Sequence, residues 1–225
     1  MATLKDIAME TGLSVSAVSR ILNEPDFASP ATRKKVFDAI ESTGYVKNYM
    51  AKNMKDGKSR QIALIINDIT NQFFSCIARG VEDVCNEYGY LLLLCNTDED
   101  LARENRYLDL IKGKLCDGFI ISVASETESR LAEIDCTKIP YVMVSRKHRR
   151  AKADFVGFDE YNGAYAAVTH LISLGHKRIA TITGLIDSEP GSERQRGYEE
   201  ALRDNGIEVD RDLIRYCDFR SESAY

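Results

Sequence analysis

Residues 12–25, GLSVSAVSRILNEP, combine a helical apolar stripe with an opposite face of small and polar side chains. That second face carries Val15, Ser16, Ser19 and Arg20, where a helix kept only for packing usually carries Glu and Lys. Valine can contact the methyl group of thymine, serine can donate or accept a hydrogen bond, and arginine can bind guanine through two hydrogen bonds. The face therefore suits contact with base edges. The apolar stripe consists of Leu13, Val18, Ile21 and Leu22.

Two helices near the N-terminus are expected to carry this face. Thr3 can cap a helix over 4–10, and Asp6, three residues further on, completes a capping-box pattern. Ser14 is the N-cap candidate of the next helix, which we expect to end near Leu22. The base-contacting residues then lie in the first two turns of this second helix.

A third helix is predicted by Ser29 and Pro30, because a capping serine followed by proline is a common helix start. We expect it to run to about Ser42, to end before a glycine, and to bury Val36 and Ile40. Three short helices, the first two joined by a tight turn, therefore occupy the first 45 residues or so.

The spacing of five residues favours a helix-turn-helix over other three-helix arrangements. Ala8 must be small where the second helix crosses the first, and Gly12 tolerates the positive φ of the turn. Ile7, Val18 and Ile21 would fill the wedge between the helices. The alternative is a generic three-helix bundle, which needs no small residue at position 8.

In a helix-turn-helix the second helix enters the major groove and its N-terminal residues meet base edges. We therefore expect Val15, Ser16 and Arg20 to contact bases, and Ser14 and Ser19 to contact phosphates. The partner is double-stranded DNA. The predicted DNA-binding residues of this region are Thr3, Ser14, Val15, Ser16, Ser19, Arg20 and Asn23.

Charge is distributed unevenly along the 225 residues. Residues 1–60 hold ten Lys and Arg against seven Asp and Glu, a net charge of +3, and the rest hold 20 against 28, a net charge of −8. A basic N-terminal part joined to an acidic body is typical of a nucleic-acid-binding module attached to another domain. The excess is modest and supports the helix-turn-helix without establishing it.

Composition excludes several other classes of protein. The chain is 44% hydrophobic and 29% charged, as in soluble globular proteins, and its longest apolar run, YLLLLC at 90–95, suits a buried strand better than a membrane span. The N-terminus has no export signal, so a cytoplasmic location without membrane contact is expected. Six cysteines without a CxxC pair and three scattered histidines predict neither disulfides nor a metal site, and no cofactor motif is present.

The segment TLKDIAMETGLSVSAVSRILN closely resembles the N-terminal signature of the LacI/GalR family of bacterial transcriptional regulators. Two positions depart from the family pattern, Leu13 where valine is usual and Ala17 where threonine is usual. Both changes are compatible with an apolar environment and leave the module intact.

The next segment, GYVKNYMAKNMKDGKS at 44–59, resembles the family's hinge. Asn48 can cap a helix over 49–56, and the resemblance implies that this helix orders on DNA and pushes Met54 into a central minor-groove step. Ala51 would let the backbone approach the duplex, and Lys55 would hold phosphate. Lys47 replaces the family's usual proline, which loosens the helix entry. The alternative is a polar linker with a frayed helix.

From Gln61 onward, short apolar strands alternate with amphipathic helices, which predicts doubly wound parallel sheets covered on both faces. The fold class is therefore an all-α headpiece with a hinge helix, joined to an α/β domain. The expected strands are 62–67, 90–95, 118–122, 140–145, 155–158, 178–184 and 213–217, and the expected helices are 73–88, 99–112, 126–134, 160–174 and 191–205.

The α/β body resembles the periplasmic-binding-protein-like sensor of the same family, in NQFF, GYLLLLCNTDED, CDGFIIS, LGHKRIATITG and RQRGYEEAL. Sheets of this kind bind ligands at the carboxyl ends of their strands. The resemblance implies a small-molecule effector site, a sugar or related metabolite being the expected ligand. Its predicted residues are Phe73, Phe74, Arg146, Asp159 and Arg194.

Each of these assignments has an alternative. Phe73 and Phe74 open an amphipathic helix and could belong to the core, and Arg194 could pair with a surface carboxylate. Arg146 lies in a basic run and could be a solvated charge. Ser145 stands where the family often has Asp before the arginine, and Gln72 replaces the proline of the family's NPFF pattern.

The resemblance implies a transcriptional repressor that binds a pseudo-palindromic operator as a homodimer in its full-length form. An exported solute-binding protein for sugars is disfavoured, because the chain has a helix-turn-helix and no export signal is found in the sequence. An enzyme on the same scaffold is disfavoured because the chain has no GxGxxG, GxxxxGK[ST], HExxH or GxSxG motif, so catalytic residues are not expected.

The expected division is a DNA-binding domain at 1–46, a hinge at 47–59, a first lobe at 60–158 and part of a second lobe at 159–225. The family's second lobe needs further strands and crossovers, so the sensor is expected to be incomplete and the chain a fragment or a truncated reading frame. An edge strand and apolar helix faces would then be uncovered, and the isolated chain would be poorly soluble or partly molten.

Overall fold

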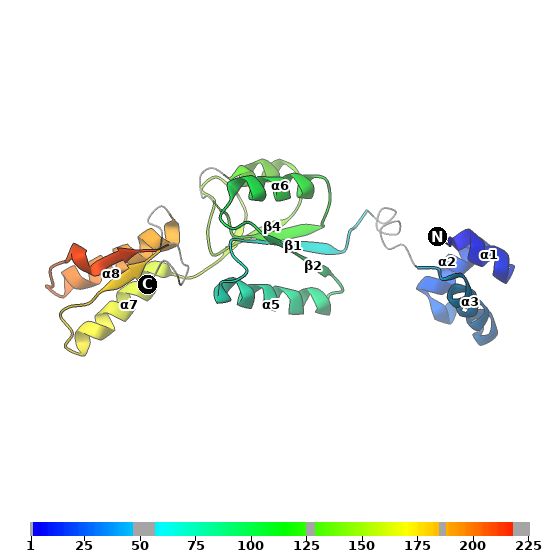
Figure 1. Cartoon of the computed structure of the whole chain (residues 1–225), viewed down its shortest axis with the longest axis horizontal. Helices are drawn as coiled ribbons and strands as arrows, with labels where there is room; N and C mark the ends of the chain where they lie inside the picture. The colour runs from blue at the N-terminus through cyan, green and yellow to red at the C-terminus, as the bar shows by residue number, and fades with distance from the viewer. Residues whose placement is uncertain (1, 47–56, 125–128, 185–187, 218–225) are drawn as a thin grey trace. The chain divides into compact units, whose positions relative to one another are not determined.

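The computed structural model describes residues 2–46, 57–124, 129–184 and 188–217. The chain divides into two compact units, Met1–Gly57 and Lys58–Tyr225, each of which is described by itself (Figure 1). The predicted hinge helix over 49–56, with Ala51, Met54 and Lys55, lies outside the described residues.

The first unit contains the three predicted helices, and local side-chain signals set their ends. Ser14 Oγ accepts from the N–H of Ala17, and Gly12 has the predicted positive φ of 68° in the turn before it. Ser29 caps the third helix by accepting from the N–H of Thr32. The elements are α1 (Leu4–Thr11), α2 (Val15–Asn23), the 3₁₀ helix η1 (Pro25–Phe27) and α3 (Pro30–Thr43).

The core of this unit is the predicted wedge, with one correction on α3. Ala39 is 4% exposed, whereas Ile40, which we predicted to be buried, is half-buried at the edge of the cluster. Ala39 follows Val36 by three residues and shares its face, and the larger Ile40 side chain packs against the same cluster from its flank. The buried cluster is Ile7, Ala8, Val18, Ile21, Val36 and Ala39.

The second unit contains a five-stranded parallel sheet in the order β2-β1-β3-β4-β5, with helices on both faces (Figure 1). The strands pair in register throughout, for example Ile62 with Leu92 of β2 and with Gly118 of β3. This order confirms the doubly wound α/β prediction. The strands are β1 (Gln61–Ile66), β2 (Leu91–Asn96), β3 (Gly118–Ile121), β4 (Tyr141–Val144) and β5 (Asp154–Val156), and the helices are α5 (Gln72–Glu87) and α6 (Leu101–Lys112).

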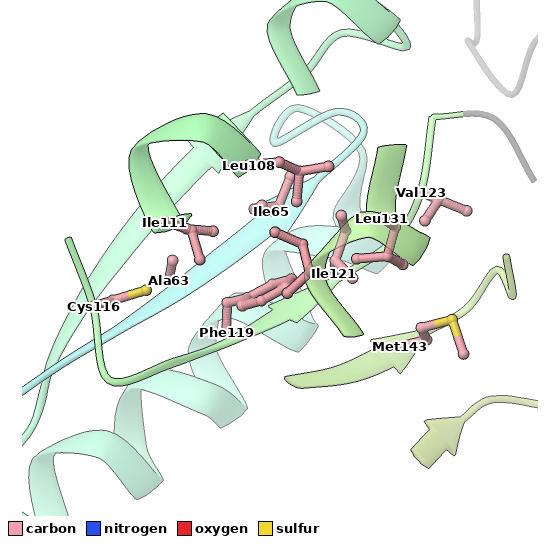
Figure 2. Packing of buried hydrophobic residues seen from close by; sticks show 11 residues of the cluster. Ala63, Ile65, Leu108, Ile111, Cys116, Phe119, Ile121, Val123, Leu131 and Met143 are labelled. Carbon is pink, nitrogen blue, oxygen red and sulfur yellow. The ribbon is translucent and has the colours of Figure 1, made fainter. Parts of the chain in front are cut away.

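Alternate residues of β1 point to opposite faces of the sheet and build two separate cores. Ala63 and Ile65 pack against Leu108 and Ile111 of α6, together with β3 and Met143 of β4 (Figure 2). Leu64 and Ile66 pack on the other face, in the cluster that contains Phe74 of α5. These four side chains are fully buried, because β1 lies inside the sheet between β2 and β3 and is covered on both faces.

One predicted helix has a different form. The helix expected over 126–134 is, within the described residues, a 3₁₀ helix, η2 (Arg130–Cys136). Its two fully buried side chains, Leu131 and Ile134, are three residues apart, which is the period of a 3₁₀ helix. Burial of this pair against the α6 face of the sheet therefore fits the tighter helix.

The remaining elements form a second, two-stranded parallel sheet with two helices that pack against each other. Its strand β6 is shorter than the predicted 178–184, because the ladder with β7 joins only three residue pairs, from Thr181 with Ile214 to Thr183 with Tyr216. The elements are α7 (Glu160–Ser173), β6 (Thr181–Thr183), α8 (Glu189–Asp204), η3 (Arg211–Leu213) and β7 (Ile214–Tyr216). No helix in the described ranges is long and apolar enough to cross a bilayer.

Gly197 of α8 sets how closely α7 and α8 approach. A Cβ atom at this position would lie 2.3 Å from the carbonyl oxygen of Tyr161 and 3.0 Å from the backbone nitrogen of Tyr165. We expect Gly197→Ala to push the helices apart and to destabilise their packing by about 1–3 kcal/mol. Amide hydrogen exchange in α7 and α8 measures this loss of protection.

Gly163→Ala is the matched control for that substitution. Gly163 also lies in a helix of this pair, but a Cβ atom there would have no neighbour within 4 Å. Alanine should therefore stabilise α7 by about 0.5–1 kcal/mol, because it restricts the unfolded chain without a clash. Equal exchange rates in the two variants would contradict the role assigned to Gly197.

Candidate DNA-reading and effector-binding residues

The predicted reading face of α2 is accessible at its N-terminal end. Ser14, Val15 and Ser16 are exposed, Val15 to 41%, and the hydroxyls of the two serines lie 3.0 Å apart. Val18 of the same helix is fully buried in the headpiece core, so α2 has one packed face and one free face. The structure therefore places Val15 and Ser16 where a duplex could reach them.

Arg20 lies further along the same face and is held by two neighbours. Its Cζ atom is 3.5 Å from the centroid of the Phe27 ring, and its Nε is 3.5 Å from a carboxylate oxygen of Glu24. The amide of Asn23 donates to the backbone oxygen of Ser19 at 2.7 Å. Of the predicted contact residues that the structure describes, Ser19 is the one that is only half-exposed.

Thr3 marks the start of α1, where Asp6 accepts both its backbone N–H at 2.7 Å and its hydroxyl at 2.8 Å. These hydrogen bonds, the backbone one first, hold the pKa of the Asp6 carboxyl below its usual value. Thr3 is exposed, and its carbonyl oxygen accepts from the N–H groups of Asp6 and Ile7. The predicted phosphate contact of Thr3 stays a prediction.

In the second unit, Arg146 is a buried charge rather than part of a solvated basic run. Its side chain is 8% exposed and binds Glu99 through two hydrogen bonds, Nη1 to Oε2 and Nη2 to Oε1, each 2.8 Å long. Glu99 Oε2 also accepts from the amide of Asn67 at 2.9 Å, and the same amide donates to the oxygen of Val123 at 3.2 Å. The alternative of a solvated arginine is therefore wrong.

This network joins the segments that follow four strands, β1, β2, β3 and β4, at the carboxyl edge of the sheet. Three residues of these segments adopt left-handed backbone conformations, Asp98 with φ 54°, Glu99 with φ 61° and Ser145 with φ 65°. Such conformations are uncommon for residues other than glycine and concentrate where chains turn sharply at functional sites. Here they turn the chain after β2 and after β4, on either side of the ion pair.

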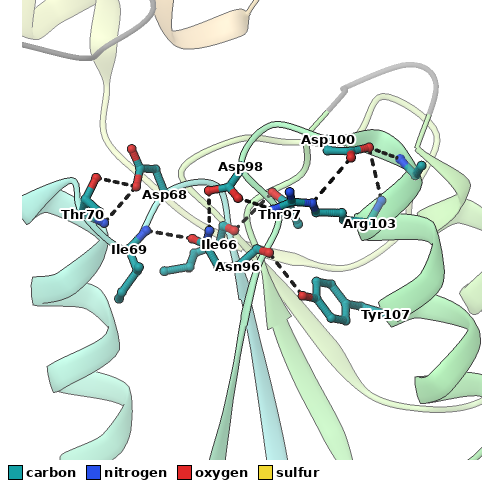
Figure 3. Close-up of polar contacts among 11 residues, drawn as sticks. Ile66, Asp68, Ile69, Thr70, Asn96, Thr97, Asp98, Asp100, Arg103 and Tyr107 are labelled. Atoms are coloured by element: carbon teal, nitrogen blue, oxygen red, sulfur yellow. Dashed lines mark hydrogen bonds and ion pairs between the residues drawn. The ribbon is translucent and has the colours of Figure 1, made fainter. Parts of the chain in front are cut away.

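Further hydrogen bonds hold the loops after β1 and β2 together (Figure 3). Asn96 accepts from the backbone N–H of Ile69 at 2.8 Å, and its amide donates to Asp98. Arg103 of α6 forms an ion pair with Asp98, and the hydroxyl of Tyr107 donates to the oxygen of Asn96 at 3.2 Å. The loop that carries Glu99 is therefore fastened to both α6 and the loop after β1.

A buried carboxyl also lies close to Arg146. Glu104 of α6 is fully buried and accepts from the N–H of Ala124 at 2.6 Å. Burial raises the pKa of this carboxyl, and hydrogen bonds from Ser129 and Ala124 oppose that shift. The side chains of Glu99, Glu104 and Arg146 thus form one electrostatically connected group at the strand ends.

The two phenylalanines at the start of α5 have different environments. Phe74 is 6% exposed and belongs to the core with Leu64 and Ile66, as the alternative interpretation had it. Phe73 is 36% exposed, and its ring centroid lies 5.1 Å from that of Phe74 and 6.0 Å from that of Phe158. Phe73 is therefore the one whose ring is accessible to a ligand.

Asp159 and Arg194 belong to the second sheet's helices. Arg194 binds Glu160 of α7 through two hydrogen bonds of 2.6 and 2.9 Å, and the Glu160 side chain is 17% exposed. Asp159 caps α7 by accepting from the N–H of Asn162, and this bond lowers the pKa of its carboxyl. The Arg194 partner foreseen as an alternative exists, although it is largely buried rather than on the surface.

An apolar groove of about 690 Å³ lies elsewhere in the unit, between α5 and the first residues of β3 and β4. Its lining includes Ile77 and Val81 of α5 and Tyr141 of β4. None of the five predicted effector-binding residues is among the side chains that line it. The groove is therefore distinct from the network at the carboxyl edge of the strands.

Comparison with known proteins decides the family. Residues 3–48 match the family described as bacterial regulatory proteins, lacI family, and residues 59–225 match the family of periplasmic binding proteins and sugar binding domain of the LacI family. The HTH-type transcriptional regulator RegA of Clostridium saccharobutylicum is 37% identical over all of this chain and 68% of its own length. The chain belongs to the LacI family of bacterial regulatory proteins. It is a DNA-binding transcriptional regulator, as the resemblance implied.

Two solved structures support the fold of this LacI-family chain. The transcriptional regulator CelR in complex with cellobiose matches 99% of the chain and 68% of its own chain, with 31% identity and a TM-score of 0.65. The Lac repressor dimer bound to operator and the anti-inducer ONPF matches 100% and 68%, with 21% identity and a TM-score of 0.82. The predicted headpiece joined to a periplasmic-binding-protein-like domain is confirmed.

The sequence of this LacI-family member did not identify Glu99 as the partner of Arg146 or Glu160 as the partner of Arg194. Glu99 lies in the acidic segment NTDED and Arg146 in the basic segment SRKHRR, and both segments follow strands. Opposite charges that follow two strands of the same parallel sheet could have suggested the pair. Asn67 and Glu160 carried no comparable signal, because a single amide or carboxylate at a strand or helix end is common.

Proposed function

We propose that this LacI-family chain is part of a repressor that binds a pseudo-palindromic operator as a homodimer and responds to a small-molecule effector. The observation that carries the proposal is the free N-terminal face of α2, where Val15, Ser16 and Arg20 are accessible while the opposite face is packed in the core. Val15 would contact thymine methyl groups, Ser16 a base edge and Arg20 a guanine. Ser14, Ser19, Asn23 and Thr3 would contact the sugar-phosphate backbone.

For the effector, a sugar or related metabolite, the support is the polar network at the carboxyl edge of the five-stranded sheet. Arg146 and Phe73 would provide one part of the site, with Phe74 supporting Phe73 from the core. Asp159 and Arg194, on the second sheet's helices, would provide another. An arginine and a carboxylate match hydroxyl groups that donate and accept, and an aromatic ring matches the apolar face of a sugar.

The effector would act by binding one conformation of the sensor better than another, because only a difference in affinity shifts an equilibrium. The proposed organisation is a headpiece at 1–46, a hinge at 47–59, and lobes at 60–158 and 159–225, working in the cytoplasm without catalysis. The boundary between the two compact units, Gly57 to Lys58, falls within the proposed hinge, which supports a separate headpiece.

The proposal is tested by selecting binding sites from a pool of random duplexes with the purified chain, at two salt concentrations. Enrichment of a palindrome is the expected result and would also yield the operator. Weak, sequence-blind and steeply salt-dependent binding would show phosphate contacts alone, and would count against a specific dimer of this chain.

The hinge is tested by Met54→Ala. If Met54 is a minor-groove wedge, its removal should weaken binding to the selected operator by about tenfold, because the apolar side chain no longer stabilises the kinked step. Binding to a non-specific duplex should change little, and fluorescence anisotropy measures both affinities. Unchanged operator affinity would exclude the wedge role.

A further inference from the structure

Phe27 is an aromatic side chain that the headpiece core does not use. It is 54% exposed and lies outside the buried cluster of α1, α2 and α3. Its ring instead lies under the guanidinium of Arg20, with 3.5 Å between the Arg20 Cζ atom and the ring centroid. An exposed aromatic ring gains little stability from burial. The contact with Arg20 is therefore the interaction that Phe27 makes in this position.

The backbone that carries Phe27 is fixed to the rest of the headpiece. The 3₁₀ helix η1 begins directly after α2, and the N–H of Phe27 donates to the carbonyl oxygen of Glu24 at 3.0 Å. Arg33 of α3 also donates to the carboxylate of Asp26 at 2.8 Å, although Asp26 is 97% exposed and this contact adds little. The ring is thus set against α2 mainly by the backbone of η1 and not by its own side chain alone.

Stacking on Phe27 leaves the N–H donors of Arg20 available to DNA. The five N–H donors of a guanidinium lie in its plane, whereas the ring contacts its flat face. A long arginine side chain otherwise loses rotamer entropy when it forms two hydrogen bonds to guanine, and pre-ordering in the free protein reduces that loss. A stacked Arg20 is therefore better prepared for bidentate contact than a freely rotating one.

Glu24, the other neighbour of Arg20, is a weaker candidate for this role. The Nε to Oε2 distance is 3.5 Å, and both side chains are more than half exposed, at 56% and 64%. Exposed ion pairs of this kind contribute little, and they weaken as salt is added. A carboxylate facing DNA would also repel phosphate. The ring of Phe27 is the stronger restraint.

We propose that Phe27 is a positioning residue for Arg20 and that it thereby sets how strongly this protein discriminates guanine at one operator position. The proposal rests on the proposed function of Arg20 as a guanine reader. It assigns to η1 a part in sequence recognition, although Phe27 itself need not touch the duplex.

The test is a double-mutant cycle with the full chain and the duplex that the unaltered chain selects. Phe27→Ala should weaken binding by about threefold to tenfold, the range expected when a stacked cation loses its ring. In the Arg20→Ala background the same change should have almost no effect. Phe27→Tyr, which keeps an aromatic face, should bind normally, and Phe27→Leu should resemble Phe27→Ala.

A second measurement separates positioning from a structural role. The ratio of affinities for the selected duplex and for one with adenine in place of the guanine read by Arg20 should fall in Phe27→Ala and Phe27→Leu. A loss of headpiece stability would lower both affinities and leave the ratio unchanged. Circular dichroism melting of each variant controls for folding.

Two results would overturn the proposal in different ways. If Phe27→Ala weakens binding equally with and without Arg20, the ring acts on DNA or on folding by itself, and the guanine-reading role of Arg20 survives. If Arg20→Ala leaves both affinity and the guanine preference unchanged, the proposed role of Arg20 fails, and positioning by Phe27 fails with it.

Discussion

Replacing Arg20 by alanine is expected to weaken binding to the selected operator by about 1–3 kcal/mol, or roughly fivefold to 150-fold in Kd. Arg20 is the only arginine of α2, and its Cζ atom lies 3.5 Å from the centroid of the Phe27 ring. Two hydrogen bonds to guanine would be lost together. The expected signature is a relaxed base preference at a single position in each half-site, measured by fluorescence anisotropy on a set of single-base variants.

Arg20→Lys and Lys35→Ala are the controls for this prediction. Lysine keeps the charge but cannot bind guanine in the same planar, two-bonded manner, so Arg20→Lys should also lose preference. Lys35 is an exposed residue of α3, and its removal should leave the base preference intact. If Arg20→Lys retained the full preference of the unaltered chain, that preference would not depend on two hydrogen bonds from an arginine to guanine.

The second large effect is expected at Glu99. Its removal in Glu99→Ala deletes both charge-assisted hydrogen bonds to Arg146, a guanidinium that is only 8% exposed. Removal of one partner of a buried ion pair typically lowers the free energy of unfolding by about 3–5 kcal/mol. Because Glu99 is 33% exposed, we expect the lower end of that range. Amide hydrogen exchange in β1, β2 and β4 should show the loss of free energy of unfolding.

Two further variants show whether the cost comes from the buried charge. Glu82 pairs with Arg79 on the surface of α5, where both side chains are more than half exposed, so Glu82→Ala should cost less than about 0.5 kcal/mol. Combining Glu99→Ala with Arg146→Met removes the charge itself and should restore most of the lost stability. If the double variant is as unstable as Glu99→Ala, packing rather than charge is the cause.

The headpiece could be predicted almost residue by residue, because its signals are local. Ser14 and Ser29 cap helices that begin at the next residue, and Gly12 supplies the left-handed turn that only a few residue types adopt readily. The one error, at Ile40, concerns which of two neighbouring apolar residues faces the core. Helical period alone leaves that choice within one residue, since both lie on the same side of α3.

The parallel sheet was also predictable, because apolar strands alternate with helices along the sequence. Continuous apolar runs such as IALIIN and YLLLLC marked the strands. The first is covered on both faces, but the second, expected to be buried, is the edge strand β2, in which Leu91 and Leu94 are exposed. The same pattern could not separate Phe73 from Phe74, because adjacent helical residues point about 100° apart and the orientation of α5 on the sheet determines which one is buried.

The sequence by itself determined the helix-turn-helix, the doubly wound sheet and the family. Only the tertiary structure decided that the buried Arg146 binds Glu99, 47 residues earlier in the chain, that Arg194 binds Glu160, and that Phe27 lies under Arg20. Caps, turns and periodicity act over a few residues and leave a local pattern. Arg146 meets Glu99 because parallel strands end at the same edge of the sheet, and Phe27 meets Arg20 because a turn folds back on its helix. Such contacts depend on the path of the backbone in space, which leaves no local pattern in the sequence.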